Sequence, residues 1–114
     1  MNPIVKQKWI AALRSGEYKQ GKEALRRGEK FCCLGVLCVL AIKSGVEVNV
    51  SSTRIDGADK YQFDGEGWFL PKVVQEWAEL DSDNPSDGLG NTLSNLNDNN
   101  VPFTQIADLI EEHL

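Results

Sequence analysis

Three cysteines lie close together in the chain, and they are the first side chains that could do chemistry. Cys32 and Cys33 are adjacent and Cys38 follows five residues later, so the set contains no C-x-x-C pair. A tetrahedral zinc site needs four ligands, and the only histidine is His113, far away in the sequence. Neighbouring side chains on a helix point about 100° apart, which strains a disulfide between Cys32 and Cys33. We therefore expect no metal site and no cofactor.

A reactive thiol is the catalytic alternative. A helix N-terminus flanked by cations lowers the pKa of a cysteine, and Cys32 and Cys33 stand at the head of an apolar run behind lysines and arginines. No neighbouring base is visible, and the chain contains no G-x-S-x-G, P-loop, G-x-G-x-x-G or H-E-x-x-H motif. We therefore expect buried, inert thiols and a protein that is not an enzyme.

The cations upstream of the cysteines indicate anion binding. They lie just before a predicted helix whose first free N–H groups come from about residues 31 to 34, an arrangement that favours a phosphate. An aromatic side chain, Trp68, Tyr61 or Tyr18, could stack on a base if it lined the same cleft. The predicted ligand-binding residues are Tyr18, Lys19, Gln20, Lys22, Arg26, Arg27, Lys30, Cys32, Cys33 and Trp68.

The charge of the chain is divided unevenly along its length. Residues 1–30 carry eight basic and three acidic side chains, whereas residues 31–114 carry four basic and fourteen acidic ones. Such a division predicts a dipolar surface unless the fold interleaves the two regions. Lys6, Lys8 and Arg14 also fit the solvated face of a first helix, so the basic segment at residues 19–30 is the more informative one.

Two other binding motifs fail on inspection. The segment DSDNPSDG resembles a calcium loop, but Pro85, Ser86 and Thr92 occupy the fifth, sixth and twelfth positions, where that loop needs a ligand, a glycine and a glutamate. FTQIADLIEEHL has the F-x-x-I-A spacing of a helix-turn-helix. Only seven residues follow Ala107, too few for a recognition helix, and duplex DNA is therefore disfavoured as a partner.

Hydrophobic periodicity predicts the helices. Residues 3–14 form a helix that starts at Pro3 and stops at Ser15-Gly16, and the uncharged residues 31–42 form a core helix covered on all sides. Helices are also expected at residues 71–80, around Leu89, Leu93 and Leu96, and at residues 103–114. The run at residues 31–42 is too short to cross a membrane, which takes about 20 residues. The first residues lack the features of a signal peptide, so we expect a cytoplasmic protein with no membrane partner.

The strands are expected in the middle of the chain. VEVNV, residues 46–50, alternates valine with polar residues, and YQFDGEGWFL, residues 61–70, gives two aromatic runs around a turn at residues 64–67. Residues 17–30, with Gly21 and Gly28 as turn signals, are compatible with an ordered loop or a short hairpin, and we interpret them as a basic loop. The predicted fold is a single compact α+β domain over residues 1–114, with four to five helices around an antiparallel β-sheet of two to three strands. A homo-oligomer is compatible with this fold.

Five motifs follow one another through the chain: W-x-x-A-L-x-S-G-x-Y, C-C-L-G-V-L, L-P-x-x-V-x-x-W, L-N-D and F-x-x-I-A-D-x-I-E. In this order they resemble a group of small, uncharacterised proteins encoded by bacteriophages and prophages. Members of the group tend to start the last helix with Ser, where this chain has Pro102. The resemblance implies a phage product in the cytoplasm of a host cell, and small accessory proteins of phages often neutralise host defences.

Two functions are compatible with these features. The first is a non-catalytic protein that sequesters an anionic small ligand, such as a nucleotide signal, on the basic segment. The alternative is an anti-CRISPR-like inhibitor that blocks a host enzyme through an acidic face mimicking phosphates. The acidic residues considered for that face are Asp56, Asp59, Asp64, Glu66, Asp81, Asp83 and Asp87.

Overall fold

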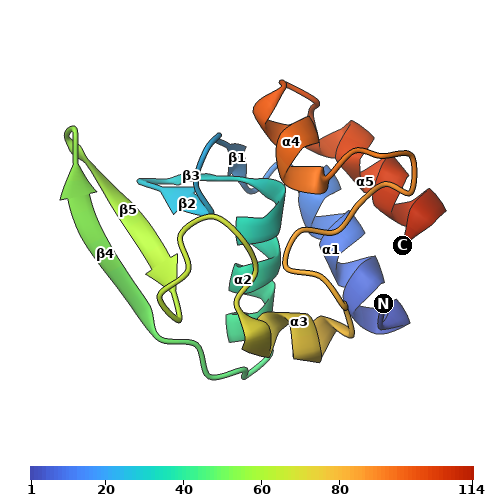
Figure 1. Cartoon of the computed structure of the whole chain (residues 1–114), viewed down its shortest axis with the longest axis horizontal. Helices are drawn as coiled ribbons and strands as arrows, with labels where there is room; N and C mark the ends of the chain where they lie inside the picture. Colours follow the sequence, from blue (N-terminus) through green and yellow to red (C-terminus); the bar gives the residue numbers. More distant parts are fainter.

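Five helices and five short strands make up the fold in a computed structural model that describes residues 1–114 (Figure 1). The helices are α1 (Pro3–Ser15), α2 (Cys33–Lys43), α3 (Lys72–Ala78), α4 (Leu93–Asp98) and α5 (Phe103–His113). The strands are β1 (Lys19–Gln20), β2 (Arg26–Arg27), β3 (Lys30–Phe31), β4 (Val50–Ile55) and β5 (Ala58–Phe63). The predicted α+β domain is confirmed, with more strands than the two to three expected.

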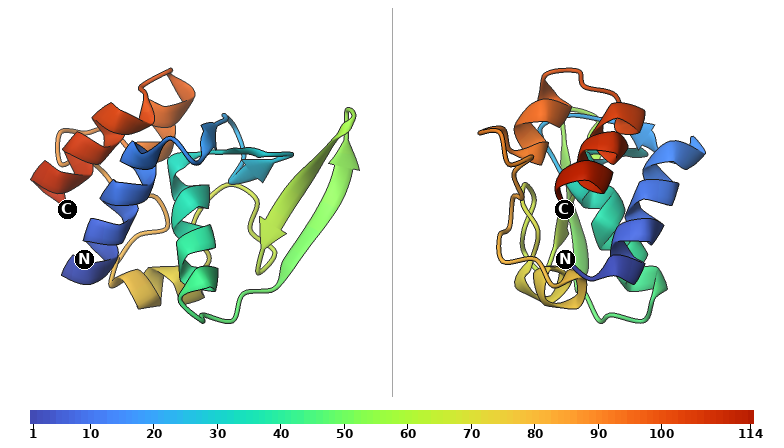
Figure 2. Two further views of the ribbon diagram at one scale, coloured as in Figure 1. Left: turned by 180° about the vertical axis from the view of Figure 1, so that it is seen from behind. Right: turned by 90° about the vertical axis from the view of Figure 1, so that its right-hand side faces the viewer.

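All five strands belong to one mixed sheet in the order β1-β3-β2-β5-β4. β1 runs parallel to β3, and the other neighbouring pairs are antiparallel. The helices gather on one side of the molecule, and the β4–β5 hairpin projects from them (Figures 1 and 2). Every residue of β4 is exposed, so this edge strand is held by its pairing with β5.

The core lies among the helices and against the basic end of the sheet. Trp9 on α1 is fully buried, and its indole N–H donates to the carbonyl oxygen of Cys33 at 2.9 Å. α1 is further joined to α5 by the guanidinium of Arg14, which lies 2.7 Å from Asp108 and 3.4 Å from Glu111. The first six residues of α2 are buried on every side, as predicted. The prediction fails at the end of the helix, where Val39 and Leu40 are only partly buried and Ile42 is exposed. No helix combines the length and the apolar composition that crossing a bilayer requires.

The first turn of α2 touches the backbone next to β2. A Cβ atom placed on Gly35 would lie 1.8 Å from the carbonyl oxygen of Leu25, which is also the acceptor for the N–H of Cys32 at 3.2 Å. Only a residue without a side chain allows this approach. Gly35 in the C-C-L-G-V-L motif therefore sets how closely the helix lies to the strand that carries Arg26 and Arg27.

The predicted strands are partly wrong. VEVNV contributes only Val50 to a strand, and residues 68–70 form none. The hairpin turns instead at Asp56-Gly57, where both residues have positive φ (50° and 79°), as a two-residue type I′ turn requires. Asp64-Gly65 makes a second tight turn of this kind, with φ of 51° and 82°, immediately after β5. The Asp-Gly pairs therefore determine where the chain turns, whereas the alternation of valines in VEVNV does not produce a strand.

Two other segments also differ from the prediction. Residues 17–30, interpreted as a basic loop, instead contribute β1, β2 and the start of β3. β2 and β3 pair as the short antiparallel hairpin that was the alternative, and β5 gives β2 a second partner that is distant in sequence. Leu89 was expected on the short fourth helix, but it is 70% exposed in the loop before α4. The remaining predicted helices are present, and their ends differ from the prediction by at most two residues.

We predict that Gly35→Ala destabilises the protein by roughly 1–3 kcal/mol or more, because the new methyl group collides with the Leu25 carbonyl. The measurement is the free energy of unfolding in urea. Gly67→Ala is the matched control, since its nearest atoms are 3.9 Å from the added Cβ and its φ is not positive. A Gly35→Ala protein as stable as Gly67→Ala would show that the contact between α2 and β2 is unimportant.

Candidate anion-binding surface

Four cations lie side by side across the sheet. Strand register pairs Lys19 with Lys30, Lys30 with Arg27, and Arg27 with Lys60. Directly paired residues on neighbouring strands point to the same face, so the four side chains line one face in a single row. We call Lys19, Lys30, Arg27 and Lys60 the cation row. On β4, Thr53 continues the row with a neutral side chain.

No member of the cation row forms an ion pair within the protein. The ion pairs in the structure involve Arg14, Arg54 and His113, and none uses a member of the row or the nearby Lys22. The guanidinium group of Arg27 makes one hydrogen bond to the protein, a long one of 3.4 Å to the carbonyl oxygen of Ile55, so most of its five N–H donors remain free. Like charges placed directly opposite one another destabilise a sheet. The fold therefore tolerates a repulsion that a bound anion would relieve.

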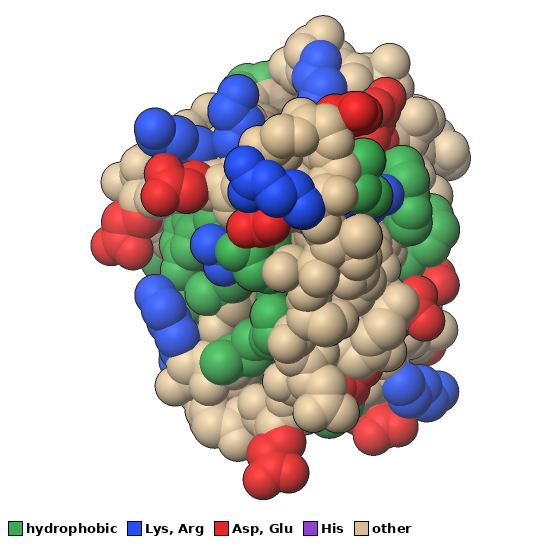
Figure 3. Space-filling model, turned by 90° about the vertical axis from the view of Figure 1, so that its left-hand side faces the viewer, with side chains coloured by type: hydrophobic (Ala, Val, Ile, Leu, Met, Phe, Trp, Pro, Cys, Tyr) green, Lys and Arg blue, Asp and Glu red, His purple; other side chains and the backbone are tan.

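An open groove of about 710 Å³ lies over this face. Its lining includes four cations, Lys19, Lys22, Arg27 and Lys30, and two carboxylates, Glu23 and Glu29. Figure 3 shows Lys and Arg side chains gathered mainly in the upper part of the hairpin side, next to acidic and hydrophobic ones. The cations that line the groove thus outnumber the carboxylates, which leaves the groove with a net positive charge.

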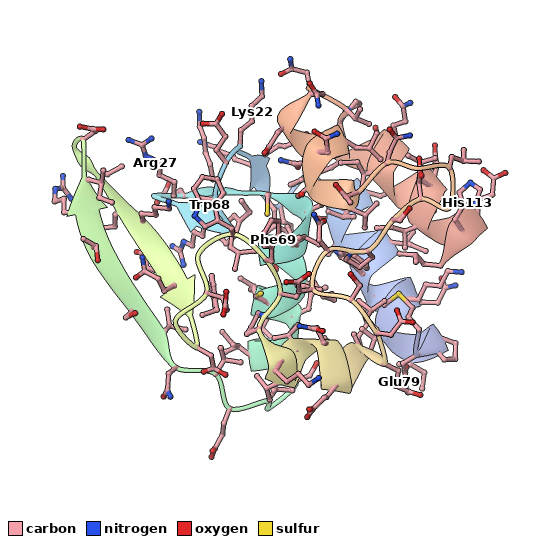
Figure 4. All side chains as sticks on the ribbon, viewed as in Figure 1. Lys22, Arg27, Trp68, Phe69, Glu79 and His113 are labelled. Carbon is pink, nitrogen blue, oxygen red and sulfur yellow. The ribbon has the colours of Figure 1, made fainter.

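Trp68 stands beside the row. Its ring centroid is 4.1 Å from Nζ of Lys60, and the side chain is 50% exposed. It lies between two smaller hollows, one of about 160 Å³ that it shares with Lys22, Arg27 and Lys60, and one of about 90 Å³ that it shares with Phe69. Figure 4 shows Lys22, Arg27 and Trp68 near one another around β2. The structure thus brings predicted residues from two distant segments together.

Sequence analysis missed Lys60 and Glu23. Lys60 lies 30 residues beyond Lys30, and only the β2–β5 register places it in the row. Glu23 has a positive φ of 60°, and its N–H donates to the Asp98 carboxylate at 3.0 Å. Its side chain borders all three hollows. Lys60 stands just before the predicted strand that begins at Tyr61, and nothing in the sequence pattern connected it with the basic segment.

Tyr18, Arg26 and Tyr61 lie on the opposite face of the sheet. The guanidinium of Arg26 is 4.2 Å from the ring centroid of Tyr61 and 5.0 Å from that of Phe31, and its Nε donates to the carbonyl oxygen of Gly28. Tyr18 packs edge-on against Phe31 at 5.4 Å. These side chains pack between the sheet and the hydrophobic core formed with the helices α1–α5, which we call the helical body. The structure therefore separates Arg26 and Tyr18 from the cation row, although all were predicted for one site.

The expectation of an open α2 N-terminus is wrong. Cys32 and Cys33 are buried, the N–H of Cys33 donates to the side-chain oxygen of Asn97 at 3.3 Å, and the N–H of Gly35 reaches the sulfur of Cys32 at 3.4 Å. These amides already have internal partners and do not face the groove. Burial raises the pKa of Cys32 to about 11 and also raises the pKa of Cys33 and Cys38. At neutral pH these cysteines are protonated thiols.

The buried amide of Asn97 holds the basic segment in place. Its Nδ2 donates to the carbonyl oxygen of Gly21 at 2.7 Å, and its Oδ1 accepts from Nε2 of Gln20 at 2.9 Å as well as from Cys33. Gln20 then accepts the N–H of Phe103 at 3.1 Å, which caps α5. Gln20 was predicted as a ligand contact. Although its residue borders the groove, its side chain serves this internal network.

Four of the acidic residues considered for a docking face are spread apart or already bonded within the protein. Asp56 lies in the hairpin turn and Asp64 follows the other end of β5, and the six residues between them in an extended strand span about 17–20 Å. Asp59 pairs with Arg54 at 3.6 Å. Asp87 is buried and accepts the N–H of Leu89 at 2.7 Å, which lowers the pKa of Asp87. These four residues therefore do not form one free acidic face.

We predict that Lys30→Glu stabilises the unliganded protein by about 0.5–1 kcal/mol at low salt, because it places a carboxylate between Lys19 and Arg27. The gain should disappear in 1 M salt, where charges are screened within about 3 Å. Urea unfolding at both salt concentrations measures it. Lys8→Glu, on the exposed side of α1, makes the same change in net charge and is expected to have little effect. If Lys30→Glu were less stable than the wild type at low salt, repulsion between the cations of the row would not destabilise the protein.

The comparisons with known proteins place the chain in one family. Residues 1–114 match a family model described as "Domain of unknown function (DUF8296)". No curated protein and no solved structure matches the chain. Because the match covers the whole sequence, helical body and cation row included, the chain belongs to the DUF8296 family.

Proposed function

We propose that the protein binds an anionic small ligand, such as a nucleotide, on the cation row and holds it without converting it. The observation that supports this most strongly is the in-register row of Lys19, Lys30, Arg27 and Lys60, none of which has a carboxylate partner in the structure. A negatively charged ligand gains favourable interactions with all four at once and removes their mutual repulsion. Arg27 can also bind a phosphate through two N–H groups.

The proposed role contains no catalytic step. The cysteines are buried as thiols, and none of them lines the main groove. Cys32 lines only the smallest hollow, beside Trp68. His113 lies on α5, next to Glu112 and Gly88, and Figure 4 shows it on the far side of the helical body from Arg27. The groups that line the groove are cations, carboxylates and a half-exposed indole, which suit recognition and retention of a ligand.

Sequestration follows from binding without turnover. A phage accessory protein in the cytoplasm of its host, as the resemblance implies, would lower the free concentration of a nucleotide signal in proportion to its own abundance and affinity. An inhibitor acting through an acidic face remains a prediction, and the scattered positions of its residues give it less support. The cation row is therefore the surface on which the proposal rests.

We predict that ATP and inorganic tripolyphosphate raise the melting temperature of the protein at low salt, whereas adenosine does not. A ligand at about 100 times its Kd stabilises the folded state by about 2.7 kcal/mol, and screening by salt should weaken this effect. Thermal unfolding monitored by circular dichroism provides the measurement.

Two variants serve this experiment. Arg27→Glu should abolish the stabilisation by both anions, because it breaks the row at its centre, whereas Lys8→Glu should retain it with the same net charge. If neither anion stabilises the wild-type protein, or if Arg27→Glu responds as strongly as Lys8→Glu, the cation row is not the binding site.

A further inference from the structure

The dimensions of the cation row indicate what kind of anion it fits. Neighbouring strands are about 4.8 Å apart, so the three steps from Lys19 to Lys60 cover roughly 14 Å. One phosphate group can contact two adjacent members of the row, which leaves the outer cations without a partner. A ligand with phosphates spaced along a chain can pair with the whole row. The register therefore favours an elongated anion that lies across the strands.

Trp68 adds a second, different recognition element at one end of the row. Its indole is half exposed, contacts the ammonium group of Lys60, and lines the hollow that contains Lys22 and Arg27. Aromatic side chains beside a cationic track are the usual platform for the bases of single-stranded nucleic acids. Inorganic polyphosphate has no group that would use such a platform. A base inside a duplex has both faces covered by its neighbours, so the stacked base must be unpaired.

We propose that the ligand is a short single-stranded oligonucleotide. Its phosphodiester groups lie along Lys19, Lys30, Arg27 and Lys60, and one base stacks on Trp68. This inference rests on the proposed function and narrows it to a class of ligand. The same phosphodiester chemistry occurs in a free oligonucleotide and in an internal segment of a longer strand, and these two sources can be separated by experiment.

The affinities of four probes test this inference by isothermal titration calorimetry: tripolyphosphate, ATP, a mixed-sequence tetranucleotide and a 30-nucleotide single strand. We expect the tetranucleotide to bind at least tenfold more tightly than ATP. The tetranucleotide has three phosphates. A plot of the logarithm of its association constant against the logarithm of the salt concentration should therefore have a slope of about −2. If the 30-nucleotide strand and the tetranucleotide bind with equal affinity per site, the ligand is an internal segment of a longer strand. If the tetranucleotide binds more tightly, the ligand is a free oligonucleotide.

Trp68→Leu separates base stacking from charge. It should weaken tetranucleotide binding roughly tenfold or more and leave tripolyphosphate binding unchanged, since only the first ligand has a base. Tripolyphosphate binding also shows that the variant is folded. Lys19→Gln should weaken tetranucleotide binding and reduce its salt slope by about 0.7, because one phosphate contact is lost.

Two results would overturn the inference without overturning the proposed function. One is a tetranucleotide that binds no more tightly than ATP or tripolyphosphate while these anions still bind the row. The other is a Trp68→Leu protein that binds the tetranucleotide as tightly as the wild type. Absence of binding by all four probes would instead contradict the proposed function itself.

Discussion

The buried carboxamide of Asn97 is the interaction on which the rest of the structure depends. It joins the carbonyl oxygen of Gly21, the side chain of Gln20 and the first turn of α2, and these groups belong to segments that are far apart in sequence. A buried polar group that loses its partner costs roughly 1–3 kcal/mol, so the network holds these segments strongly. Through it, two-residue strands that could not form alone keep a fixed register. The L-N-D motif thus has a structural explanation.

This arrangement holds like charges together at a cost in stability. The helical body supplies the stability, through a buried core that includes Trp9 and the close contact of Gly35 with Leu25. The sheet face outside this core carries Lys30 and Arg27 as direct neighbours. Binding sites often retain such locally unfavourable features, because optimising them for stability removes the function. The separation of a stable body from a charged face explains how a small domain maintains the cation row.

The sequence alone predicted the helices well, because their periodicity is local. The uniform apolarity of residues 33–38 correctly indicated burial on all sides. The turn signals in residues 17–30 allowed a short hairpin, but the pairing of β2 with β5 could not be predicted, because two residues carry no period and Lys60 lies 33 residues beyond Arg27. The same limit concealed Lys60. The N-terminus of α2 was misjudged for a related reason: its cap, Asn97, is 64 residues away from Cys33.

For the site, the sequence identified the right segment and the wrong geometry. Clustering of cations at residues 19–30 pointed to Lys19, Lys22, Arg27 and Lys30, all of which border the groove. The clustering of cations could not show that Arg26 and Arg27 face opposite sides of the sheet. Successive side chains alternate between the two faces only in a strand, and the segment was not known to form one. A charge cluster therefore locates a site, and only the register shows which charges act together.

Amide chemical-shift mapping by NMR tests the central claim most directly. The account predicts that adding tripolyphosphate to the labelled protein at low salt shifts the signals of Lys19, Lys30, Arg27 and Lys60 together, with a common saturation curve and little change in α1 or in the loop at residues 79–92. Shifts scattered over the basic residues of α1, or confined to the N-terminal turn of α2 with the row unaffected, would contradict it.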